Sequence, residues 1–240
     1  MRVSVVIPVL DDAEELTGCL AALAAQSRPA DEIVVVDNGC TDPSATLARE
    51  SGARVVREPR RGIPAAAATG YDEATGEVIC RLDADSRPGP DWLERIVGAF
   101  TDDPALDALS GPGEFLELTG WRARAARLLY MEAYFTSVGS AMAHPTLFGS
   151  NLAMRRSAWE RVRDRVHRDD PELHDDIDLS FQFGATDRLR LDRTLTVGIS
   201  ARPFDDPAGM RRRFTRAFRT IGVNWRISPP WRRWLERMSG

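Results

Sequence analysis

Residues 77–88 have the sequence Glu-Val-Ile-Cys-Arg-Leu-Asp-Ala-Asp-Ser-Arg-Pro. The apolar run at residues 78–82 predicts a buried strand that ends at two carboxylates one residue apart, Asp83 and Asp85, before Pro88 breaks it. Two acidic groups at the end of a buried strand are costly unless a cation or hydrogen-bond donors meet them. A divalent cation carrying a diphosphate would do so, because Mg²⁺ and Mn²⁺ prefer hard oxygen ligands. The alternative is a solvated Asp-x-Asp turn.

Strands and helices alternate around this stretch. Strands are expected at residues 3–9, 33–36, 53–56 and 77–82, with amphipathic or alanine-rich helices between them. This alternation predicts an α/β fold whose mostly parallel central sheet carries helices on both faces. Ligands in such sheets bind beyond the carboxyl ends of the strands. Acidic residues at three of these ends, Asp11 and Asp12, Asp37, and Asp83 and Asp85, should therefore gather at one edge.

The second half of the chain has a less regular pattern. Strands are expected at residues 106–110 and 114–118, a helix at 121–135, a loop and strand at 146–154 and a helix at 157–166. The acidic cluster in residues 173–181 should open another helix, and residues 191–199 should hold one or two strands. Without internal repeats or a low-complexity linker, the chain is expected to be one domain with an elaborated tail.

Composition limits the chemistry. The chain has 240 residues, 43% of them apolar and 28% charged, which is typical of a globular protein. Every basic residue apart from the three histidines is arginine, so mechanisms that need a lysine Schiff base or a P-loop lysine are excluded. Three cysteines without a pairing pattern, no secretory signal and no long apolar run predict a cytoplasmic protein.

Residues 203–240 form a basic tail. They contain nine arginines and three acidic residues and thus carry a net charge of +6. Because the net charge of the whole chain is −4, the other residues together carry −10. Two amphipathic helices are expected here, capped by Asp206 and Ser228. The tail would pack on the domain as acceptor-side helices, lie on an anionic membrane, or form a dimer contact. Nucleic-acid binding is disfavoured, because no recognised motif is present.

The chain resembles the GT-A-fold glycosyltransferases of family 2 over roughly residues 1–200. An ordered set of segments carries the resemblance: 3–9, 33–42, 62–76, Leu82-Asp-Ala-Asp85, 149–156 and His174-Asp-Asp-Ile-Asp-Leu179. The resemblance implies a GT-A (Rossmann-like) catalytic domain at 1–202, with a nucleotide-sugar half at 1–110 and an acceptor half at 111–202. Residues 203–240 would be its helical tail.

The resemblance implies an inverting transfer of a sugar from a nucleotide-diphosphate donor, a UDP- or GDP-sugar, to an acceptor hydroxyl or phosphate. A Gln-x-x-Arg-Trp motif of processive polymerases is not evident, which favours transfer of a single sugar. A membrane-facing tail would suit a lipid-linked acceptor and a place at the inner face of the membrane.

The same resemblance assigns site residues. The nucleotide-sugar subsite would be formed by Pro8, Val9, Asp12, Asp37, Arg61 and Asp83. Within it, Asp37 would accept an N–H of the base and Asp83 would contact the ribose. Asp85 would bind the divalent cation, Mn²⁺ or Mg²⁺. Asp176 would be the general base, with Asp175 as the second candidate.

The chain departs from the family pattern at several positions. Leu10 replaces a frequent aromatic residue, Asn38 and Cys40 replace Asp and Ser, and His174 precedes the acidic pair. Crowding of acidic residues would raise one pKa in the cluster, whereas the start of a helix would oppose this. We expect the three histidines to be structural or surface residues.

Two other functions remain as alternatives. A nucleotidyltransferase also has a strand-first α/β sheet, but it usually needs a glycine-rich loop and a lysine. Residues 8–14 contain no glycine, and the chain has no lysine. A non-catalytic sugar-nucleotide-binding module is the second alternative, and the acidic residues Asp85 and Asp176 argue against it.

Overall fold

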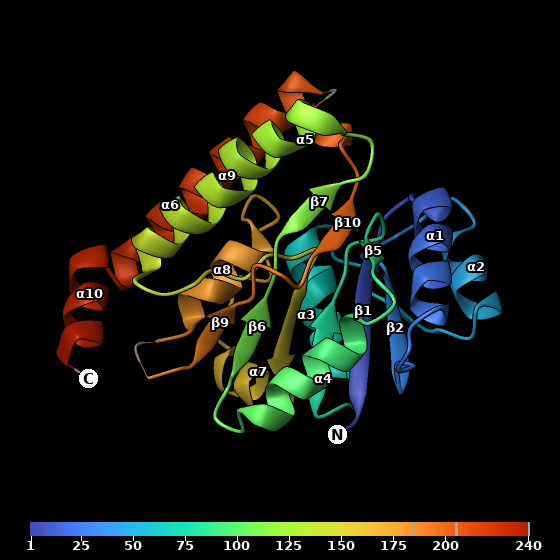
Figure 1. Ribbon diagram of the computed structural model, residues 1–240, viewed down its shortest axis with the longest axis horizontal. Helices are drawn as coiled ribbons and strands as arrows, with labels where there is room; N and C mark the ends of the chain where they lie inside the picture. Colours follow the sequence, from blue (N-terminus) through green and yellow to red (C-terminus); the bar gives the residue numbers. More distant parts are fainter. Residues whose placement is uncertain (185, 205, 240) are drawn as a thin grey trace.

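The computed structural model describes residues 1–184, 186–204 and 206–239 (Figure 1). Asp205 and Gly240, two residues of the predicted tail, lie outside the described residues, as does Ala185.

A seven-stranded sheet forms the centre of the molecule. Its strands are β1 (Val3–Val9), β2 (Glu32–Asp37), β3 (Arg54–Arg57), β4 (Val78–Arg81), β6 (Ala108–Ser110), β8 (Leu152–Arg155) and β9 (Leu189–Leu191). Their order is β3-β2-β1-β4-β8-β6-β9. Only β8 opposes its neighbours β4 and β6, and the other pairs are parallel. The predicted mostly parallel sheet is confirmed.

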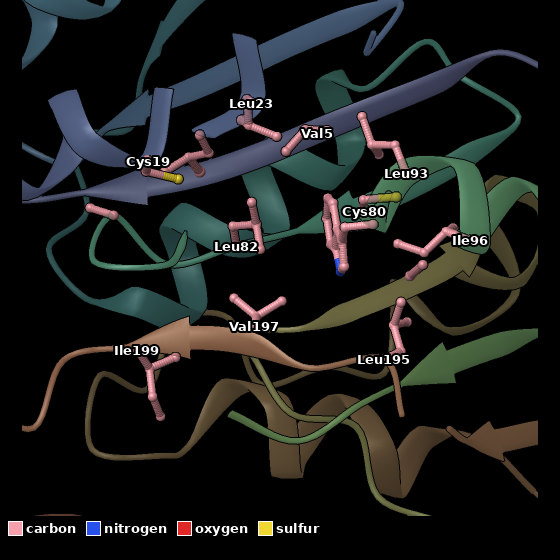
Figure 2. Packing of buried hydrophobic residues seen from close by; sticks show 14 of the residues in the cluster. Val5, Cys19, Leu23, Cys80, Leu82, Leu93, Ile96, Leu195, Val197 and Ile199 are labelled. Carbon is pink, nitrogen blue, oxygen red and sulfur yellow. The ribbon is translucent and has the colours of Figure 1, made fainter. Parts of the chain in front are cut away.

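Helices cover both faces of this sheet. On one face lie α1 (Ala13–Ala24), α2 (Ser44–Glu50) and α4 (Trp92–Asp102); on the other lie α3 (Ile63–Glu73), α7 (Arg156–Val162) and α8 (Asp175–Gln182). All seven residues of β1 are buried, since alternate side chains enter the two cores. Figure 2 shows Val5 and Cys80 packing with Cys19, Leu23 and Leu93 on the first face.

The alanine-rich helix α3 lies unusually close to the sheet. A Cβ atom at Gly70 would lie 2.3 Å from Cγ1 of Val6 and 2.9 Å from Cγ2 of Val36. Small residues on this helix therefore let its backbone approach β1 and β2, and this explains the alanine and glycine content of the segment.

A second, three-stranded sheet joins distant parts of the chain. It contains β5 (Arg87–Pro88), β10 (Val197–Ile199) and β7 (Gly113–Phe115), in that order. The predicted strand at 114–118 is therefore short and lies outside the central sheet. Residues 191–199 belong to two strands in different sheets, β9 and β10. Val197 and Ile199 of β10 belong to the main core, and Figure 2 shows Val197 facing Leu82.

The remaining helices form one flank of the molecule. A continuous helical segment contains α5 (Gly120–Ala126), the π-helical turn η1 (Arg127–Glu132) and α6 (Ala133–Met142), so it is longer than the predicted 121–135. A short 3₁₀ turn, η2 (Arg202–Phe204), leads to α9 (Pro207–Ile227) and α10 (Pro230–Ser239). Asp206 caps α9 as predicted, accepting the Ala208 N–H at 3.1 Å.

Helices α9 and α10 pack against α6 and α8 (Figure 1). The buried residues of α9 are polar, Thr220 and Asn224, whereas Phe218 of its apolar stripe is 73% exposed. Among the described residues, no helix combines the length and the apolar character that crossing a membrane would require.

Candidate functional site

The carboxyl ends of β1, β2 and β4 bring the predicted acidic residues to one edge of the sheet. Val9 pairs with Asp37, and Val6 pairs with Arg81, two residues before Asp83. The strands are parallel, so the loops that follow them leave from the same edge. The sequence-based prediction that these acidic groups gather is confirmed for the strand ends.

Asp37 holds the turn that follows β2. Its Oδ1 accepts the backbone N–H groups of Gly39 at 3.0 Å and Cys40 at 2.8 Å. Gly39 adopts a φ of 91°, which favours glycine. The neighbouring Asn38 is buried and supports the next loop, since its Oδ1 accepts the Gly62 N–H at 2.8 Å. The residue that replaces the family's aspartate is therefore structural.

The other residues predicted for the nucleotide pocket have different environments. Pro8 and Val9 are buried within β1, and the side chain of Val9 belongs to the main core. Arg61 is exposed and lies beside the Gly39 turn, with its Nε 3.9 Å from the position of a Cβ atom on that glycine. Arg61 can thus reach a ligand at this edge, whereas Pro8 and Val9 can offer backbone and close packing.

Asp11 and Asp12 are adjacent but have different partners. Asp11 has a φ of 49°, and its Oδ1 accepts the Thr41 N–H at 2.6 Å, which lowers the pKa of Asp11. Asp12 forms a bidentate ion pair with Arg202, with N–O distances of 3.0 and 2.9 Å. Asp11 therefore joins two loops, and Asp12 faces a cation.

Asp83 is fixed on both carboxylate oxygens. Oδ1 accepts from Arg81 Nη2 at 2.7 Å, and Oδ2 accepts from Ser150 Oγ at 2.6 Å. Asp85 instead makes one ion pair, with Arg202 at 3.6 Å. Burial and the neighbouring charge of Asp83 raise the pKa of Asp85 to about 6. Asp83 is thus positioned by the protein, while Asp85 retains capacity for a further cation.

Arg81 connects this turn with the acidic cluster on α8. The side chain is 2% exposed and forms ion pairs with Asp83 and Asp175. The field of these carboxylates raises the pKa of Arg81 well above its usual value, although burial acts in the opposite direction. This buried arginine was not predicted as a site residue, and the only signal was a charged residue in an otherwise apolar strand.

Asp176 is held by several hydrogen bonds within the acidic cluster. It accepts from the N–H groups of Gly149 at 2.9 Å and Ile177 at 2.7 Å, and from Tyr134 Oη at 3.3 Å. His174 Nδ1 lies 3.3 Å from its Oδ1. Burial alone would raise the pKa of Asp176, but the hydrogen bond and charge of His174 contribute to lowering it to about 2.

The two neighbouring acidic residues have other environments. Burial raises the pKa of Asp175 to about 6 against the opposing charge of Arg81. Asp178 is 3% exposed and accepts from His167 Nδ1 at 2.8 Å and from Asn224 Nδ2 at 2.8 Å. Asp178 therefore links a loop and α9 to α8 and is structural.

The described residues contain two groups of three side chains whose ligand atoms lie within 4.8 Å of one another. These groups are Asp11, Cys40 and Asp42, and His174, Asp175 and Asp176. Neither group includes Asp85. The described part of the chain therefore offers no such three-ligand group around the residue that is predicted to bind the cation. The predicted cation would depend on Asp85, nearby carboxylates and substrate oxygens.

Comparisons with known proteins agree with this arrangement. A sequence model of the Glycosyl transferase family 2 matches residues 4–163. The glycosyltransferase AglE of Haloferax volcanii is 34% identical over 121 residues, covering 47% of this chain and 40% of AglE. The undecaprenyl-phosphate 4-deoxy-4-formamido-L-arabinose transferase of Edwardsiella ictaluri is 31% identical over 170 residues, covering 59% of this chain and 51% of the transferase. The chain thus spans about half the length of these relatives.

The fold also matches a solved structure. Mannosyltransferase PcManGT from Pyrobaculum calidifontis, in complex with GDP-Man and Mn²⁺, superposes with a TM-score of 0.69 at 22% identity. The match covers 99% of this chain and 69% of PcManGT. The predicted GT-A fold is therefore confirmed.

Proposed function

Since the chain belongs to glycosyl transferase family 2, we propose that it moves a single sugar from a nucleotide-diphosphate sugar to an acceptor hydroxyl or phosphate, with inversion. One observation carries the proposal. Arg81 joins Asp83 to Asp175. Asp83 lies at the sheet edge where the nucleotide sugar is predicted to bind, which we call the donor edge, and Asp175 belongs to the acidic cluster that holds the candidate bases. The carboxylate proposed to bind the donor is thereby held next to the cluster that contains the two candidate bases.

The donor edge has the ligands that a divalent cation requires. Asp85 would hold the cation, with Asp12 nearby, because both offer hard carboxylate oxygens. The position of the Arg202 guanidinium on these two carboxylates supports this, since a positive group is already stabilised there. A bound Mn²⁺ or Mg²⁺ would stabilise the charge that develops on the departing diphosphate. The complex of PcManGT with GDP-Man and Mn²⁺ supports a GDP-sugar donor, and a UDP-sugar is the other donor proposed.

The nucleotide would lie along the ends of β1 and β2. Asp37 would accept an N–H of the base through its second oxygen, because its first holds the Gly39 turn. Asp83, fixed by Arg81 and Ser150, would accept from a ribose hydroxyl. Pro8, Val9 and Asp12 would line the pocket, and the exposed Arg61 would approach the nucleotide.

Asp176 is the proposed general base, and Asp175 is the second candidate. The hydrogen bonds to Asp176 fix its orientation and keep it ionised at working pH. A carboxylate with a low pKa is a weak base, so proton transfer would occur late, when bond formation makes the acceptor hydroxyl acidic. Asp175 is a stronger base by its pKa, but its carboxylate is already paired with Arg81.

The proposed acceptor is lipid-linked. The E. ictaluri relative is named as an undecaprenyl-phosphate transferase, and α9 and α10 expose aromatic side chains next to arginines. Aromatic and arginine side chains suit the surface of an anionic membrane. The tail at 203–240 would therefore bring the catalytic domain to the membrane that contains its acceptor.

Thermal shift with UDP-, GDP- and dTDP-sugars, with and without MnCl₂, tests the donor proposal. At least one donor should raise the melting temperature, and Mn²⁺ should increase that effect. The proposal fails if none of these donors stabilises the protein. Donor hydrolysis then separates the alternatives, since a binding module would show the shift without turnover. A nucleotidyltransferase would instead release pyrophosphate from a nucleoside triphosphate and a sugar phosphate.

A further inference from the structure

Arg202 brings a cation to the donor edge from a distant part of the sequence. Its two terminal nitrogens donate to the two carboxylate oxygens of Asp12 at 3.0 and 2.9 Å, and Nη2 lies 3.6 Å from Oδ2 of Asp85. Asp12 and Arg202 are 190 positions apart in the chain. The guanidinium therefore contacts Asp85, to which we assign the divalent cation, and Asp12 beside it.

The backbone on both sides of Arg202 is anchored. Before it, β10 pairs with β5, and the Ala201 N–H donates to Glu117 Oε2 at 2.7 Å. After it, the ring of Phe204 packs edge-on against Phe115 at a centroid distance of 4.8 Å. The Arg202 side chain itself is 53% exposed. The fold thus fixes where the side chain starts while its guanidinium remains accessible to solvent and ligands.

We propose that the Arg202 guanidinium exchanges between two anionic partners. The first is the pair of carboxylates of Asp12 and Asp85, and the second is the diphosphate of the donor. This inference rests on the proposed function. A divalent cation on Asp85 would repel the guanidinium, because both charges are positive and would share the same oxygens. The released guanidinium would then meet the diphosphate beside the cation, and its planar fork matches phosphate oxygens in a bidentate geometry.

This exchange gives Arg202 opposite effects on two affinities. For the cation alone, Arg202 is a competitor, so removing it should strengthen binding. For the nucleoside diphosphate with its cation, Arg202 is a ligand, so removing it should weaken binding. A residue with a purely structural role would not move the two affinities in opposite directions.

The test measures both affinities on the full chain. Free Mn²⁺ is followed by electron paramagnetic resonance without nucleotide, and GDP and UDP binding are followed by calorimetry at saturating Mn²⁺. Arg202→Ala should bind Mn²⁺ about threefold to tenfold more tightly and should bind the preferred diphosphate about tenfold more weakly. Arg202→Lys should fall between wild type and Arg202→Ala in both assays. Arg211→Ala removes one exposed charge from α9 and should match wild type.

An unchanged or weaker Mn²⁺ affinity in Arg202→Ala would overturn the proposal, and so would unchanged diphosphate affinity. Failure of the proposed function looks different, because wild type itself would then bind neither GDP nor UDP with Mn²⁺. The nucleotide-free Mn²⁺ titration still tests the competition in that case.

Discussion

At the scale of single residues, Arg81 shows how the site is held together. Its guanidinium is buried between Asp83 and Asp175, and the missing side chain at Gly149 makes room for it. A Cβ atom at position 149 would lie 2.6 Å from Nη1 of Arg81. A buried arginine is tolerated because carboxylates meet it, and each carboxylate in turn depends on the arginine.

Replacing Arg81 with methionine should therefore destabilise the protein strongly. We expect Arg81→Met to lower the free energy of unfolding by about 3–5 kcal/mol, because Asp83 and Asp175 would lose their buried counter-charge. In the double variant Arg81→Met/Asp175→Asn, part of the lost free energy of unfolding should be recovered, because one of the two unpaired carboxylates is removed. Urea unfolding measures both effects, and Arg49→Met, at an exposed position on α2, is the control. Equal unfolding curves for wild type and Arg81→Met would show that the triad is not stabilising.

Replacing each candidate base with the corresponding amide shows which of the two accepts the proton. Asp176→Asn should lower kcat about 10²- to 10⁴-fold, because an amide is a far weaker proton acceptor than a carboxylate, while donor affinity stays near that of wild type, because the donor does not bind to Asp176. Asp175→Asn should affect turnover less and mainly disturb the ion pair with Arg81. Donor hydrolysis or transfer, measured together with donor binding by calorimetry, distinguishes the two. If Asp176→Asn retains full turnover, Asp176 is not the base.

Site residues could be predicted from the sequence where position along a strand carries the information. Asp37, Asp83 and Asp85 directly follow apolar runs, so the edge they share was predictable. Arg202 was not, since its bidentate partner Asp12 lies near the other end of the chain and no local pattern marks it. Tyr134 was missed for the same reason, because its hydroxyl reaches Asp176 from a helix 42 positions away.

At the scale of elements, the docking of α10 depends on an arginine. Arg233 is 7% exposed, and its guanidinium donates to carbonyl groups at the ends of α6 and α8, those of Met142 at 2.8 Å and Phe183 at 2.6 Å. Helix C-termini carry partial negative charge, so a cation is favourable there. The amphipathic pattern predicted both tail helices, but it could not identify the buried face, because polar side chains make these contacts.

The contact of α10 should weaken at acidic pH. Arg233 Nη2 donates to Nε2 of His144 at 2.9 Å, so this histidine is neutral and carries its proton on Nδ1, which donates to the Pro145 carbonyl at 2.8 Å. Burial and the charge of Arg233 lower the pKa of His144 from 6.5 to about 4. Because the pKa of His144 is lower in the folded than in the unfolded state, neutral His144 stabilises the fold fully above its unfolded-state pKa. This stabilisation is lost as pH falls through 4.

This contribution is about 3 kcal/mol at most, from the size of the pKa shift. Unfolding free energies measured between pH 7 and pH 4 should therefore fall less steeply in His144→Gln than in wild type. Identical slopes would exclude this histidine as the cause of acid sensitivity.

At the scale of the whole molecule, charge and exposed apolar groups are unevenly distributed. The tail at 203–240 carries +6, whereas the rest of the chain carries −10. Many of the large exposed apolar side chains lie in the flanking helices: Trp121, Leu128, Leu129, Phe214, Phe218, Ile227, Trp231, Leu235 and Met238. The sequence predicted the basic tail, but the contribution of α5 and η1 emerges only from the fold, which places them on the same flank (Figure 1).

We therefore expect the protein to bind vesicles that contain anionic phosphatidylglycerol more tightly than vesicles of neutral phosphatidylcholine. Phe214 and Phe218 lie one helical turn apart on α9 and are 52% and 73% exposed, so replacing both with serine should leave the fold intact. The double variant should have a partition coefficient lower than that of wild type by about tenfold or more, because two apolar groups no longer enter the interface.

Ile63→Ser, at an exposed position on α3, is the matched control. Co-sedimentation measures the binding, and added salt should weaken it by screening the arginines. Equal pelleting with neutral and anionic vesicles, unchanged in the double variant, would show that this flank has another partner.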